Sequence, residues 1–265
     1  YRLELRNLGG APVSIKVGRQ ELQYGDQRLV SPLDWSHIGR AWDGIKFRWQ
    51  AEGFQVDAFY TVVKEGNGAE DDQDFYGIYA TCTEVEAHAF DLYLLARRFA
   101  DNAFTDELGA TGDLKDVTFG ARGQGKAGPV DYTAEAVLQR GDYVDTDIAA
   151  SAFAATLGYT FDHEWKPRVG AEVTYASGDE DPTDGDRETF DPLFPFGHSY
   201  QGFADVFAWK NGIDYALRLK AVPAAGLTVQ LDLHAFFLEE DRDAWYSATG
   251  TAIRRDPTGA SDDRV

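Results

Sequence analysis

Apolar and polar residues alternate with a period of two along most of this chain, and no other feature constrains its fold as strongly. Val13, Ile15 and Val17 alternate with polar or small residues, and the stretch 227–233 repeats the pattern. This period places successive side chains on opposite faces of a β-strand. It predicts about twelve strands of roughly nine to eleven residues. They are expected near 1–8, 13–22, 45–51, 54–63, 75–84, 89–98, 115–124, 130–140, 147–161, 167–177, 212–222 and 227–238.

The connections between these strands alternate in length. Short turns such as 52–53 and 223–226 alternate with longer connections. The longer ones are expected at 23–44, 64–74, 99–114, 141–146, 178–211 and 239–263, and the only helix-compatible segment is 200–210. Tight turns at one edge and extended loops at the other are typical of an up-and-down antiparallel barrel that crosses an outer membrane.

A soluble fold is the alternative, because alternating strands also occur in every β-sandwich. About twelve strands without helical crossovers need closure or burial to protect their edges, which favours the barrel. We therefore predict an all-β fold, an up-and-down antiparallel transmembrane β-barrel, with a single domain over 1–265 and further strands expected beyond both ends. The rival function is a soluble or surface-exposed β-sandwich domain that binds or hydrolyses polysaccharide.

Composition excludes several other classes of protein. The chain has 25 basic and 45 acidic residues and a net charge of -20, which argues against nucleic acid as a partner. One cysteine and five histidines offer neither a disulfide nor a spaced zinc-ligand set, and no cofactor or metal is expected. The apolar stretches are too short for a membrane-spanning helix.

Two sequence blocks resemble a known family. The block 18–44 reads GRQELQYGDQRLVSPLDWSHIGRAWDG, and the block 175–202 reads YASGDEDPTDGDRETFDPLFPFGHSYQG. They resemble the conserved blocks of the alginate-export family of bacterial outer-membrane β-barrels. One departure is Trp42, where the family pattern has phenylalanine.

The resemblance implies an outer-membrane channel of a Gram-negative bacterium. Its cargo would be an anionic uronate polysaccharide or other small anions, which cross by facilitated diffusion. It implies no catalytic residue, and no enzyme motif with the required spacing is present in the sequence. The partners that it implies are anionic carbohydrate, outer-membrane lipid and lipopolysaccharide, and periplasmic export machinery.

The face opposite the apolar one would line the channel. Its basic residues are Lys16, Lys46, Arg48, Arg97, Arg122, Arg168, Arg218 and Lys220, and its acidic residues are Asp57, Asp91, Asp131, Glu135, Glu172, Asp214 and Asp232. Arginines gathered at a constriction would hold carboxylates in a fork. Alternatively, these charges pair across strands and keep the pore wet and rigid. The sequence leaves both interpretations open.

Seven arginines are the candidate substrate-binding residues. Arg19, Arg28 and Arg40 match the family block and are expected at an electropositive constriction or at a loop held in the mouth, and Arg48, Arg122, Arg168 and Arg218 lie on the lining face. Arg19 falls on the apolar face of its strand. Either Gly18 forms a bulge or the strand has left the hydrocarbon there, and a local ion pair of Arg19 with Asp26 or Asp43 is the competing role.

Overall fold

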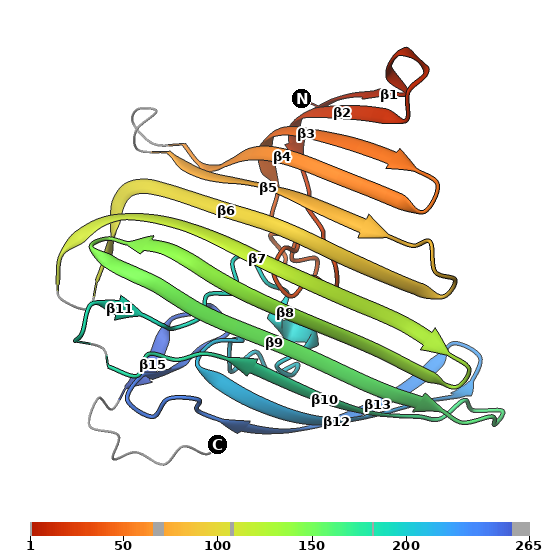
Figure 1. Ribbon diagram of the computed structural model, residues 1–265. Helices are drawn as coiled ribbons and strands as arrows, with labels where there is room; N and C mark the ends of the chain where they lie inside the picture. The colour runs from red at the N-terminus through yellow and green to blue at the C-terminus, as the bar shows by residue number, and fades with distance from the viewer. Residues whose placement is uncertain (1, 66–71, 107–108, 182, 256–265) are drawn as a thin grey trace.

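A computed structural model describes residues 2–65, 72–106, 109–181 and 183–255, which form a thirteen-stranded sheet and a separate two-stranded sheet (Figure 1). In the large sheet, strands that follow one another pair antiparallel in chain order, and β11 adds to β9 as a parallel edge. The strands are β1 (Arg2–Arg6), β2 (Val13–Gln20), β3 (Trp42–Ala51), β4 (Phe54–Lys64), β5 (Gln73–Cys82), β6 (His88–Thr105), β7 (Thr111–Ala127), β8 (Val130–Tyr143), β9 (Thr146–Thr160), β10 (Arg168–Ala176), β11 (Asp186–Arg187), β12 (Gly212–Ala224), β13 (Leu227–Phe237), β14 (Ala244–Tyr246) and β15 (Ala252–Arg255).

This topology confirms the predicted up-and-down antiparallel wall, with β1 and β13 at the ends of the strand order. Each expected strand is present, and the wall curves around a concave side on which the β2–β3 and β10–β12 connections lie (Figure 1). The barrel is not closed within the described residues. No second large sheet packs against this wall in the described part of the chain, so the β-sandwich alternative is wrong.

The outer face of the wall is an apolar band. Along β6, the outward positions run from Phe90 through Leu92 and Leu94 to Ala96, and they end at the charged Arg98. At 3.3 Å per residue, the segment from Phe90 to Ala96 is about 20 Å long, close to the height of the lipid-facing band of such barrels. Exposed apolar residues on the other strands of the wall include Ile45, Phe47, Ile78, Phe119, Leu138, Phe153, Leu157, Leu217 and Leu231.

A row of charged residues ends the apolar band on the long-loop side. The register of the strands places them side by side across β2 to β9, with Val62 as the one apolar member. The charged members are Arg19, Asp43, Asp74, Arg98, Lys115, Asp142 and Asp147. Charged groups are costly in hydrocarbon, so this row marks where the wall leaves the membrane core.

The structure corrects three boundary predictions. The expected loop 141–146 is a two-residue turn at Val144 and Asp145, and most of the expected loop 99–114 belongs to β6 and β7. Beyond the membrane core both faces of a strand are polar, so the alternation stops although the backbone pairing continues. The segment 200–210 is not helical; a 3₁₀ turn at Gly197–Ser199 precedes it. No helix of the described residues is long and apolar enough to cross a membrane.

Candidate channel lining

Two long connections fold together on the concave side of the wall. Residues 21–41 join β2 to β3, and residues 177–211 join β10 to β12 apart from the short β11. Backbone hydrogen bonds unite them: Ser31 N donates to Phe194 O at 3.0 Å, and Phe194 N donates to Leu29 O at 2.8 Å. We call these connections the two inward loops. Paired in this way, they form one body that narrows the space inside the wall (Figure 1).

Apolar side chains fix the inward loops to the wall. Val30 of the first loop is 1% exposed, and Phe75 of β5 is fully buried. The ring of Phe194 lies 4.8 Å from that of Phe75 and 5.5 Å from that of Trp42. Burial of large apolar groups is the main stabilising term in packing, so these contacts stabilise the docking of the loops on the wall.

Arg28 anchors the first inward loop to the wall. Its Nη2 donates to Glu172 Oε2 of β10 at 2.9 Å, and both side chains are 3% exposed. The guanidinium carbon lies 3.7 Å from the ring centre of Tyr200 in the second loop. Burial raises the pKa of Tyr200 to about 12, and its hydroxyl donates to Asp26 O at 2.6 Å. Arg28 therefore joins the wall and both inward loops.

The four lining arginines face inward as the strand parity predicts, and each is paired with carboxylates. Arg48 donates to both oxygens of Asp57 at 2.6 Å, and Arg168 donates to Asp131 at 2.5 and 2.9 Å. Arg122 donates to Asp91 at 2.7 Å and also to Asp26. Arg218 donates to Glu172 at 3.0 Å and to Asp232 at 3.1 Å. These pairs match the interpretation in which the lining charges pair across strands, because each guanidinium is neutralised locally.

Arg19 does not join the other arginines. It lies in the outer charged row and donates to Asp43 at 2.6 and 3.2 Å, with both side chains exposed. Gly18 pairs with Gly44 without a register shift, so the proposed bulge is absent. The second explanation, that the strand has left the hydrocarbon, agrees with this placement, as does the local ion pair.

Arg40 differs from the other six candidate arginines because its hydrogen-bond partner is a backbone oxygen rather than a carboxylate. Its Nη1 donates to the backbone oxygen of Pro195 at 2.8 Å, which ties the first inward loop to the second. Burial lowers the pKa of this guanidinium, although Arg40 remains partly exposed. Among the described residues, Arg40 alone of the seven candidates has no carboxylate within ion-pair distance.

The sequence did not identify the contacts that hold the second inward loop. Arg97 of β6 donates to Asp116 at 2.5 and 3.0 Å and to Asp191 of that loop at 3.0 Å. Gln139 of β8 donates to Asp191 O at 2.6 Å and accepts from Asp191 N at 2.9 Å. Strand parity places Arg97 on the inner face, but no sequence signal connects it to a residue 94 positions away.

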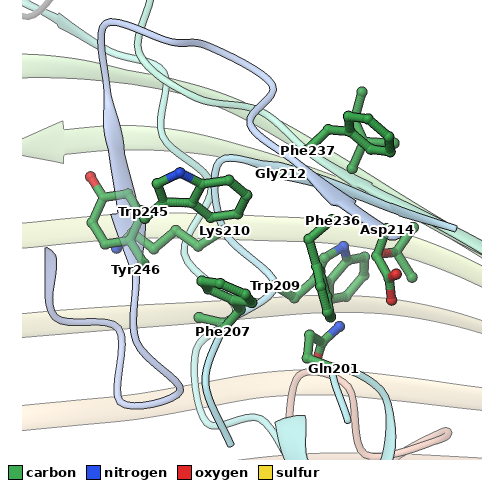
Figure 2. A pocket seen from close by; sticks show the side chains of 13 residues that line it. Gln201, Phe207, Trp209, Lys210, Gly212, Asp214, Phe236, Phe237, Trp245 and Tyr246 are labelled. Carbon is green, nitrogen blue, oxygen red and sulfur yellow. The ribbon is translucent and has the colours of Figure 1, made fainter. Parts of the chain in front are cut away.

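A small cavity lies where the second inward loop meets β12, β13 and β14. Figure 2 shows Phe207, Trp245 and Tyr246 around the Lys210 side chain, with Gln201 and Asp214 nearby. The cavity measures about 10 Å³, which is room for one water molecule and not for a sugar. It is therefore a packing junction and not a cargo site. The described residues contain no group of three or more His, Cys, Asp or Glu side chains that could hold a metal ion.

Comparisons with known proteins agree with this geometry. The sequence profile of the family described as "Alginate export" matches residues 3–265. The chain belongs to the alginate export family. No curated protein has a significant sequence match to it.

A solved outer-membrane protein has the same fold. The outer-membrane expressed OmpT of Vibrio cholerae aligns with a TM-score of 0.50 and 14% identity, over 95% of this chain and 74% of that one. OpdK of Pseudomonas aeruginosa, solved with vanillate, aligns with a TM-score of 0.44 and 13% identity, over 84% of this chain and 71% of that one. Family and fold together place this alginate export family member in the Gram-negative outer membrane as a channel protein.

Proposed function

We propose that this channel passes anionic carbohydrate, with uronate polysaccharide as the leading class and other small anions as further cargo, by facilitated diffusion. The proposal rests on Arg40. Its guanidinium lies on an inward loop without a carboxylate partner among the described residues, and a carboxylate of the cargo would provide one. The remaining inward arginines are paired with acids, so in this proposal they keep the lining rigid and hydrated.

The same proposal assigns roles to the other surfaces. Outer-membrane lipid and lipopolysaccharide would cover the apolar band and the charged row, and no residue has a catalytic role. The acid excess of the chain, with a net charge of -20, would repel anions at long range. Exposed charges are screened beyond about 8–10 Å, so the local charge at the inward loops decides which ions pass.

Planar-bilayer recordings on the full-length protein test the cargo. Uronate oligomers are expected to interrupt the current, and the reversal potential in a salt gradient is expected to indicate anion preference at low salt. Arg40→Ala should weaken both effects, whereas Arg19→Ala, which removes an arginine from the outer charged row, should leave them unchanged. Cation selectivity at low salt that Arg40→Ala does not alter would contradict the proposal.

A further inference from the structure

The tips of the two inward loops carry an exposed aromatic patch. Trp35 is 63% exposed and Phe203 is 64% exposed, and the aliphatic Ile38 and Val206 beside them in sequence are also exposed. Other apolar residues of the same loops, such as Val30, are buried against the wall. Large apolar side chains that lie together on a surface mark a binding site more often than singly scattered ones do.

A stack of rings supports this patch. The Trp35 ring lies 3.8 Å from that of His198 at an interplanar angle of 18°, so the rings are stacked. The His198 ring lies 4.9 Å from that of Phe203. His198 is 5% exposed, its Nδ1 lies 2.9 Å from Asp205 Oδ2, and its buried Nε2 has no hydrogen-bond partner. The stack is therefore held in place while much of the indole remains open to solvent.

Backbone hydrogen bonds fix both segments that carry the stack. In the first loop, Ser36 N donates to Leu33 O at 3.0 Å, and Arg40 N donates to Pro32 O at 2.6 Å. In the second loop, Gln201 N donates to Gly197 O at 2.9 Å. The Arg40 side chain then joins the two segments through Pro195 O. A surface held in one geometry binds without a large ordering cost.

We propose that Trp35 and Phe203, supported by His198, form a stacking platform for the sugar rings of the cargo. A pyranose ring has a face of C–H groups that packs on an aromatic ring and an edge of hydroxyl groups that stays hydrated. A uronate adds a carboxylate, and Arg40 offers a guanidinium on the same loop as Trp35. The proposal deepens the function proposed above and depends on carbohydrate being the cargo.

The contributions of the aromatic ring and of the charge can be measured separately. Planar-bilayer recordings of the full-length protein would measure block by uronate oligomers and by the same oligomers with their carboxyl groups reduced to alcohols. Trp35→Ala is expected to weaken block by both oligomers about tenfold, because it removes the ring that both would contact. Trp35→Phe should restore most of the block, and Arg40→Ala should weaken block by the charged oligomer more than block by the reduced one.

Matched variants separate binding from folding. Trp165→Ala removes a tryptophan of similar exposure from the short turn 161–167, outside the inward loops, and should leave the block unchanged. Ile38→Ala removes an exposed aliphatic side chain three residues from Trp35 in the sequence and should also have little effect. If Trp35→Ala and Ile38→Ala both lower the heat stability of the barrel and leave the block unchanged, the patch packs against protein and the platform is refuted.

The recordings also distinguish failure of the cargo proposal from failure of the platform alone. If neither oligomer interrupts the current of the unaltered protein, carbohydrate is not the cargo, and the platform fails with it. If uronate interrupts the current and Trp35→Ala makes no difference, carbohydrate remains the cargo and only the platform is refuted.

Discussion

Glu172→Gln should release the first inward loop from the wall. Glu172 accepts from Arg28 at 2.9 Å, from Arg218 at 3.0 Å and from Thr156 at 2.9 Å. Arg28 Nε and Nη1 have no hydrogen-bond partner, so its buried charge depends on this carboxylate. Breaking a buried ion pair by removing one partner costs about 3–5 kcal/mol. A carboxamide keeps one acceptor oxygen, so we take about 3 kcal/mol, the lower end.

That cost changes the docking equilibrium of residues 21–41 by about two powers of ten. Hydrogen exchange with mass spectrometry on the full-length protein would measure it, because amide exchange follows the local opening equilibrium. Peptides from 21–41 should exchange about a hundredfold faster in Glu172→Gln. Asp43→Asn breaks an ion pair of the same type whose side chains are exposed, and it should leave these peptides unchanged.

A double variant tests whether the uncompensated charge is the cause. Arg28→Met combined with Glu172→Gln removes the buried cation as well, so the loop should exchange more slowly than in Glu172→Gln alone. Equal acceleration in Asp43→Asn, or exchange in the double variant at least as fast as in Glu172→Gln alone, would refute the electrostatic explanation of loop docking.

Two further variants probe the packing and the membrane face. Phe194→Ala removes the ring that contacts Phe75 and Trp42, which should cost about 3 kcal/mol. Hydrogen exchange should therefore become faster in both inward loops together. Faster exchange in only one of the loops would show that the two loops open independently. Leu94→Arg, in the apolar band, should lower the unfolding free energy of the barrel in lipid vesicles by about 2–4 kcal/mol. Val62→Arg, in the charged row, should lower it clearly less. Equal unfolding free energies of the two variants would contradict the assigned membrane boundary.

The sequence predicted the wall well because each strand in the membrane core separates two environments. Lipid outside and polar lining inside impose the period-two alternation, which placed Arg48 and Arg122 on the inner face. The same signal vanishes where β8 and β9 extend past the charged row, because water lies on both sides there. The strands therefore extend to Tyr143 and begin again at Thr146, so that only a two-residue turn remains where the loop 141–146 was expected.

Ion-pair partners could not be predicted from parity alone. The pairing of neighbouring strands accounts for some of these partners, since Arg48 lies opposite Asp57 and Arg218 lies opposite Asp232 in register. The pair of Arg28 with Glu172 joins residues 144 positions apart, and it depends on how the first inward loop folds onto the wall. Loop geometry of this kind has no periodic signal in the sequence. The ring stack of Trp35 on His198 was missed for the same reason.

Single-channel conductance tests most directly whether the two inward loops narrow an outer-membrane channel. The full-length protein would be compared in planar bilayers with a variant in which residues 31–40 are replaced by a short Gly-Ser linker. Conductance should rise clearly in this variant, because the segment that carries Trp35 and Arg40 no longer lies inside the wall. Unchanged conductance would show that the inward loops do not limit the pore, and the absence of any current in both proteins would contradict the channel itself.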